Sequence, residues 1–146
     1  MTVFPDGSKE RLHGHNFNVS VALDLRRVGL ANVLDIGILK RHIDAQCREW
    51  NEHLLVAERC PKLEIISRTE EEVEFRLCGK RYVAPAEDVL FLPLDNIIVE
   101  NLSMELARLL AERLAPELSG GLVAGLEVDV REARGQGGTF YLALAD

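Results

Sequence analysis

The tripeptide His13-Gly14-His15 is the first feature of the sequence that could carry chemistry. Neutral imidazole is a good zinc ligand, and residues two apart on a strand point to the same side, so both rings can reach one ion. A catalytic zinc usually takes three protein ligands and keeps a fourth position open. The pattern is short, and a hydrogen-bonded pair of histidines at the start of a strand explains it equally well.

Acidic residues supply two further candidates. Glu132 continues the apolar alternation of residues 126–130, which would turn its carboxylate toward the interior. Such a carboxylate needs paired N–H donors, for example from a ligand, or else it is simply exposed past the end of the strand. Glu52 and His53 follow the first predicted helix and could relay a proton, although a surface pair at a helix end is the commoner arrangement.

Hydrophobic periodicity predicts the elements that must position these residues. Alternation over residues 13–25 predicts a half-buried strand, with both histidines on its apolar side. Helical spacing predicts one helix at about 35–51 and a second, with a continuous leucine stripe, at about 97–116. Three further stretches alternate as strands do: residues 62–84, 126–131 and 140–144.

Cap and turn residues delimit these elements. Asp35 can cap the first helix, and Asp95 or Asn96 can cap the second. Glycines within residues 135–138 supply a turn before the last strand. Strands gathered at the two ends of the chain around two helices predict an α+β layer rather than alternating βαβ units.

Length and composition bound the class of protein. The chain of 146 residues fits one domain, residues 1–146, and 47% of its residues are hydrophobic, as in a globular protein. A net charge of -7 without a basic stripe argues against a nucleic-acid partner. The absence of a long apolar run and of a leader predicts a cytoplasmic protein without a membrane partner. Three scattered cysteines indicate neither disulfides nor a thiolate metal site.

Taken in order, several motifs resemble those of the 6-pyruvoyl- and 6-carboxy-tetrahydropterin synthase family. The matching segments are Arg11-Leu12-His13-Gly14-His15-Asn16-Phe17, Val33-Leu34-Asp35-Ile36, Glu100-Asn101-Leu102 and Val130-Arg131-Glu132-Ala133. A subgroup of this family carries a hairpin insert, which here would span about 57–90. That subgroup also shows motifs similar to Asn51-Glu52-His53 and Glu132-Ala133-Arg134-Gly135-Gln136.

The resemblance implies a tunnelling fold, which is an antiparallel sheet with two helices packed on one face and, here, a hairpin insert between the helices. It implies a homo-oligomer, a trimer or hexamer, with its sites at subunit interfaces. It also implies a zinc ion held by three histidines, of which two match His13 and His15. Glu132 matches the carboxylate that binds the small-molecule pterin, since a carboxylate accepts two N–H bonds from an aminopyrimidinone.

Departures from the family pattern concern the chemistry. No histidine precedes His13, so the third zinc ligand is unassigned, and the first strand of the fold is expected to be missing or shortened. The position of the family's catalytic cysteine is Lys9. Glu10 is the nearest residue able to act as a base, and some branches of the family use a glutamate there. The family's Asp-His pair corresponds to Asn51-Glu52 or, shifted by one residue, to Glu52-His53, which keeps an acid and an imidazole.

The resemblance therefore predicts a zinc-dependent lyase that acts on dihydroneopterin triphosphate or a related dihydropterin. The expected reaction is a side-chain cleavage like that of 6-carboxy-tetrahydropterin synthase, with Glu10, Glu52 and His53 moving protons. Two alternatives stay open. The first is a catalytically inactive homologue that still binds a pterin, and the second is an assembly subunit without a ligand, in which His13 and His15 are structural.

Overall fold

The computed structural model describes residues 1–28 and 34–144, which form two compact units. The units are Met1–Gly14 with Trp50–Ile98, and His15–Glu49 with Val99–Asp146. Among the described residues, no helix is both long enough and apolar enough to cross a membrane.

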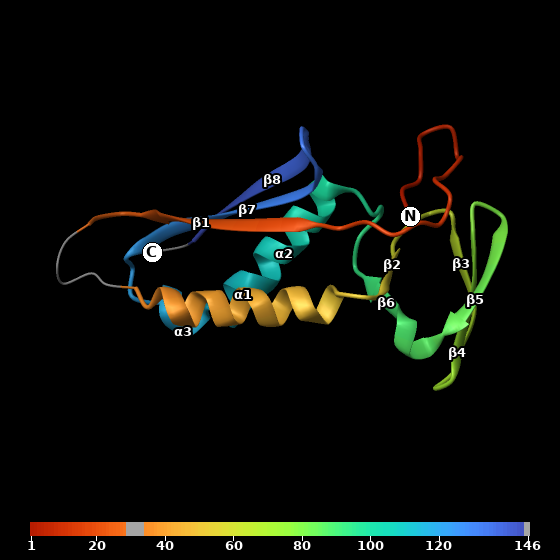
Figure 1. Ribbon diagram of the computed structural model, residues 1–146, viewed down its shortest axis with the longest axis horizontal. Coiled ribbons are helices and arrows are strands. Elements are labelled where there is room, and N and C mark those ends of the chain that lie inside the picture. Colours follow the sequence, from red (N-terminus) through yellow and green to blue (C-terminus); the bar gives the residue numbers. More distant parts are fainter. Residues whose placement is uncertain (29–33, 145–146) are drawn as a thin grey trace. The chain divides into compact units, whose positions relative to one another are not determined.

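The larger share of the predicted elements lies in the unit that contains His15. Its strands form an antiparallel sheet in the order β1-β7-β8, and helix α2 packs on both β7 and β8. Figure 1 shows α1 and α2 on the same side of this sheet, as the α+β prediction requires. The element bounds are β1 Asn18–Leu25, α1 Ile36–Trp50, α2 Val99–Arg113, α3 Ala115–Leu118, β7 Val123–Ala133 and β8 Gln136–Ala143.

A leucine stripe forms the core of this unit and confirms the second predicted helix. Leu102, Leu106 and Leu110 of α2 are at most 1% exposed, and they share the interior with apolar side chains of β7 such as Val128. The helix ends at Arg113 rather than at about residue 116, and a short helix restarts as α3. Pro116 accounts for the break, because it has no N–H to continue the hydrogen bonds of α2, whereas a proline is tolerated in the first turn of α3.

Strand β1 begins at Asn18, so the prediction of a strand from residue 13 is wrong for its first residues. The alternation continues on the N-terminal side of Asn18, but pairing with β7 begins only at Asn18, opposite Arg131, next to the point where the β7–β8 register shifts. The alternation itself holds, with Val19 and Val21 half-buried and their neighbours in sequence exposed.

Asp35 caps helix α1 as predicted. Its Oδ1 accepts hydrogen bonds from the backbone N–H groups of Gly37 at 2.8 Å and Ile38 at 3.1 Å. The predicted cap at Asp95 or Asn96 is wrong, because α2 begins only at Val99. The predicted turn after β1 falls partly on residues 29–33, outside the described residues.

The other unit holds the predicted insert. Strands β3, β4 and β5 form an antiparallel meander around Phe75, which is 0% exposed, and this confirms the strands expected within residues 62–84. A parallel pair, β2 with β6, was not predicted. The element bounds are β2 Leu54–Ala57, β3 Leu63–Arg68, β4 Glu72–Leu77, β5 Lys80–Pro85, the short 3-10 helix η1 Ala86–Asp88 and β6 Val89–Leu92.

The turn between β7 and β8 uses only one of the predicted glycines. Gly135 has a φ of 83°, in the left-handed region that glycine tolerates. Gly137 and Gly138 instead lie inside β8. A Cβ atom at Gly138 would stand 2.6 Å from the backbone nitrogen of Glu100, so this strand approaches the first turn of α2 too closely for any side chain.

We expect Gly138→Ala to lower the free energy of unfolding by about 1–3 kcal/mol, the usual cost of overpacking a close contact. The matched control is Gly120→Ala, because a Cβ there meets nothing within 4 Å. Urea denaturation of both variants measures the difference. Equal stability of the two variants would show that the approach of β8 to α2 is not tight.

Candidate active site

Two imidazoles and a carboxylate gather on the continuous segment 10–15. Glu10, His13 and His15 each offer one ligand atom, and these atoms lie within 4.8 Å of one another. Among the described residues, this is the one group of three or more acidic, histidine or cysteine side chains found that close together. Imidazole nitrogens are zinc ligands in proteins, so His13 and His15 fit the ion that the sequence predicts, and the Glu10 carboxylate lies close enough to serve as a third ligand or as a base beside it.

Both histidines use the same ring nitrogen, Nδ1, in the contacts that orient their rings. Nδ1 of His13 lies 2.6 Å from the carbonyl oxygen of Arg11, and a carbonyl only accepts. Nδ1 of His15 contacts a carboxylate oxygen of Glu132. In both rings Nδ1 is therefore the donor, and metal-binding histidines are usually oriented by such a carbonyl or carboxylate acceptor.

Glu132 lies within β7 and not past its end. Its side chain is 34% exposed and that of His15 is 22% exposed, so the contact between them is partly shielded from water. The ring of His15 also stacks on Phe17, with centroids 5.6 Å apart and an interplanar angle of 13°. The carboxylate predicted to bind a ligand is thus already placed beside one of the predicted metal ligands.

Glu10 is half-buried at the end of an N-terminal hairpin. Its backbone N–H donates to the carbonyl of Thr2 at 3.0 Å. In return, the backbone N–H of Thr2 lies 3.4 Å from the Glu10 carboxylate. The hairpin therefore holds both the backbone and the side chain of the candidate base.

Glu52 and His53 lie in the turn that follows α1. Nδ1 of His53 is 2.8 Å from the carbonyl oxygen of Asn51. Glu52 is exposed and has a φ of 59°, an unusual conformation for a residue other than glycine. Neither residue belongs to the group formed by Glu10 and the two histidines, in the part of the chain that the structure describes.

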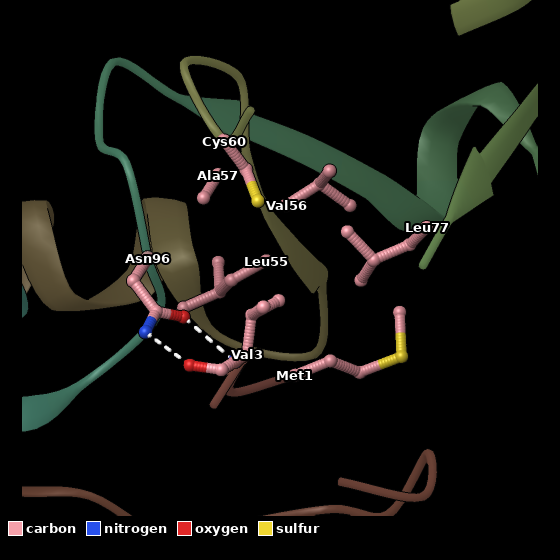
Figure 2. Close-up of a pocket in the computed structure, with 8 residues that line it drawn as sticks. All are labelled: Met1, Val3, Leu55, Val56, Ala57, Cys60, Leu77 and Asn96. Carbon is pink, nitrogen blue, oxygen red and sulfur yellow. Dashed lines mark hydrogen bonds between the residues drawn. The ribbon is translucent and has the colours of Figure 1, made fainter. Parts of the chain in front are cut away.

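Asn96 is a contributor that the sequence reasoning missed. Its side-chain Oδ1 accepts from the N–H of Val3 at 2.9 Å, and its Nδ2 donates to the carbonyl of Val3 at 2.8 Å (Figure 2). The adjoining pocket is apolar and includes Leu55 and Leu77. The amide that was expected to cap a helix instead pairs with the hairpin that carries Glu10, and no local pattern reveals a partner so distant in sequence.

Comparisons with known proteins place these residues in context. The model of a family described as 6-pyruvoyl tetrahydropterin synthase matches residues 2–142. A protein of Methanocaldococcus jannaschii, described as a candidate 6-carboxy-5,6,7,8-tetrahydropterin synthase, is 29% identical over 130 residues, which are 88% of this chain and 78% of that protein.

Solved structures agree with this match. The crystal structure of 6-pyruvoyl tetrahydropterin synthase from Plasmodium vivax superposes with a TM-score of 0.87 at 26% identity, covering 98% of this chain and 88% of that one. Two variant structures of the same protein replace a glutamate, described as its catalytic residue, by alanine or cysteine. The Plasmodium falciparum enzyme, at 21% identity and the same TM-score of 0.87, supports the fold alone.

Proposed function

Because the chain belongs to the 6-pyruvoyl tetrahydropterin synthase family, we propose that it is a zinc-dependent lyase that cleaves the side chain of a dihydropterin. Family membership supports a pterin-related lyase. The M. jannaschii relative favours a 6-carboxy-tetrahydropterin synthase-like reaction on dihydroneopterin triphosphate or a related compound. The observation that carries the proposal is the convergence of Glu10, His13 and His15 on segment 10–15.

Zinc would be held by His13 and His15, whose rings are oriented through Nδ1 by the Arg11 carbonyl and the Glu132 carboxylate. When bound, the ion would polarise the side-chain oxygens of the substrate. The Phe17 ring, stacked on His15, restricts the orientation of that imidazole. These contacts fix the first half of the site before a substrate arrives.

Glu10 is the base in this proposal. Its carboxylate takes the proton from a side-chain hydroxyl of the substrate, and that oxygen becomes the carbonyl of the departing aldehyde as the carbon–carbon bond breaks. The electron pair enters the adjacent carbon–nitrogen double bond of the pterin, and a proton is then returned to the carbon that lost the aldehyde. The P. vivax variants support the assignment, because a glutamate is described as catalytic in that relative.

Glu132 binds the pterin ring in this proposal. One carboxylate oxygen contacts His15, which leaves the second oxygen to accept an N–H of the pterin edge. The same residue would then orient a zinc ligand and hold the substrate. Such a coupling keeps the reacting side chain at a fixed place relative to the metal.

Glu52 and His53 are proposed to return the proton. An acid beside an imidazole suits this task at neutral pH. The left-handed backbone of Glu52 supports the assignment, since strained residues persist mostly where function retains them.

The proposed single domain and the trimer or hexamer with sites between subunits remain predictions, and native mass spectrometry measures the number of chains.

The deciding experiment measures zinc per chain by elemental mass spectrometry, without added metal, and then incubates the protein with dihydroneopterin triphosphate. About one zinc per chain and a cleaved pterin product by mass spectrometry support the lyase. Zinc or pterin binding without a product would identify an inactive binding homologue. Absence of zinc, pterin binding and product would identify an assembly subunit.

Replacing Glu132 with alanine is expected to weaken pterin binding about 10- to 100-fold, because the charged acceptor of the ring's N–H groups is lost. Pterin fluorescence quenching measures the affinity. Glu127→Ala is the matched control, since Glu127 lies on the same strand with an exposed side chain. Unchanged affinity in Glu132→Ala would remove this residue from the pterin site.

A further inference from the structure

The N-terminal hairpin that ends at Glu10 has a defined internal geometry. Val3 and Lys9 form an antiparallel bridge, and the N–H of Phe4 donates to the carbonyl of Ser8 at 2.9 Å. The tip turns at Gly7, whose φ is 82°. A hairpin of this size has few contacts of its own, so the position of Glu10 depends on what fixes the hairpin to its surroundings.

The first strand of the hairpin is fixed by hydrogen bonds between side chains and the backbone. The Asn96 amide pairs with Val3, and the hydroxyl of Thr2 donates to the carbonyl of Ile97 at 2.9 Å. These bonds hold the strand opposite Glu10. They reach Glu10 indirectly, through the hydrogen bonds between Thr2 and Glu10.

Lys9 adds a direct contact to the strand that carries Glu10. Its Nζ donates to the carbonyl oxygen of Glu10 at 2.9 Å and also lies 5.1 Å from the ring centroid of Tyr82. An ammonium over an aromatic face is attracted by the ring's quadrupole. The Lys9 side chain therefore joins the backbone of the candidate base to a residue of β5.

Tyr82 is itself held by the core of the meander. It lies opposite Phe75 in the β4–β5 pair, and the two rings stack with centroids 5.3 Å apart at 18°. Phe75 is 0% exposed. A continuous series of contacts thus runs from a buried aromatic ring through Tyr82 and Lys9 to Glu10.

We propose that Lys9 and Tyr82 are positioning residues that hold Glu10 in place for proton transfer, and that this is a function of the meander β3–β4–β5. The inference rests on the proposed role of Glu10 as the base. A shift of about 1 Å in a reacting group can cost roughly a hundredfold in rate. Because Lys9 contacts the backbone of Glu10, replacing Lys9 leaves the Glu10 carboxylate present but less firmly positioned.

The test compares variants that break the contact with variants that keep it. Tyr82→Leu and Lys9→Met should each lower kcat about tenfold with KM nearly unchanged, because the pterin ring is bound elsewhere. Tyr82→Phe keeps the aromatic face and Lys9→Arg keeps the cation, so both should restore most of the activity. The double variant Tyr82→Leu with Lys9→Met should be no worse than either single one, since both remove the same contact.

Lys80→Met is the control for loss of a surface charge, because Lys80 is an exposed residue of the same meander. Thermal unfolding of each variant identifies any that fail to fold. If Tyr82→Leu is unstable, the comparison of Lys9→Met with Lys9→Arg carries the test, because it leaves the stacked pair of rings intact. Equal kcat in Lys9→Met, Lys9→Arg and the parent would overturn the proposal.

A spectroscopic readout separates this inference from the proposed function. In NMR spectra the side-chain methylene protons of Lys9 should be shifted upfield by the ring of Tyr82, and this shift should vanish in Tyr82→Leu. Its absence in the parent protein would disprove the contact. An inactive Glu10→Gln with a fully active Tyr82→Leu would overturn only the positioning role, whereas an active Glu10→Gln would overturn the proposed base and this role with it.

Discussion

Glu10→Gln is expected to lower kcat by about 10²- to 10⁴-fold, the usual contribution of a positioned general base. Glutamine has nearly the same shape, so it preserves the packing of the hairpin, but its amide cannot take a proton from the substrate. The zinc content should stay near one per chain, because His13 and His15 are unchanged. Steady-state kinetics and elemental mass spectrometry on the same sample measure both quantities.

Glu70→Gln is the control for this variant, since Glu70 is an exposed residue in the turn between β3 and β4. Two other results are informative. Normal turnover in Glu10→Gln would exclude Glu10 as the base. Loss of zinc together with turnover would show that Glu10 is the third metal ligand, as its closeness to the two histidines also permits.

His15→Ala is expected to remove zinc almost completely after dialysis. Loss of a residue that only orients a metal ligand typically costs 10- to 100-fold in affinity, so loss of a ligand should cost roughly a hundredfold or more. Turnover should disappear with the metal. Titration with zinc in the presence of a competing chelator measures the affinity, and His13→Ala should behave in the same way.

His42→Ala provides the histidine control. His42 is on α1, where its Nε2 lies 3.9 Å from a carboxylate oxygen of Glu117. It does not belong to the group formed by Glu10, His13 and His15. The variant should keep its zinc. If His15→Ala binds zinc as the parent does while its unfolding temperature falls, the histidine pair is structural and the alternative of an assembly subunit gains support.

Local periodicity predicted the elements whose burial repeats along the chain. The leucine stripe of α2, the Asp35 cap of α1 and the alternation around Phe75 are all visible within a few residues of sequence. The strands β2 and β6 were missed because each is a run of only four residues. Such short apolar runs carry no period, and their pairing depends on residues far apart in the chain.

The candidate site was predictable to the same extent. His13 and His15 stand out because two ligands lie in one tripeptide, and Glu132 stands out because a carboxylate follows an apolar alternation. The start of β1 was misplaced because the apolar alternation continues beyond the residues that pair with β7. The contact of Lys9 with Tyr82 could not be predicted, because the two residues are far apart in the sequence and no local pattern around either one indicates the other.

The parallel pairing of β2 with β6 has a consequence for the order in which its unit folds. The meander between these strands closes through short turns, so its contacts are local and can form early. Leu54 and Val89 meet across the whole of that segment, and closing so long a loop first would be entropically unfavourable. Once the meander has formed, the same closure joins two ends of an already compact body. We therefore expect the meander β3–β4–β5 to form first and the flanking strands β2 and β6 to pair afterwards. In pulsed hydrogen exchange, the amides of β4 should become protected before those of β2.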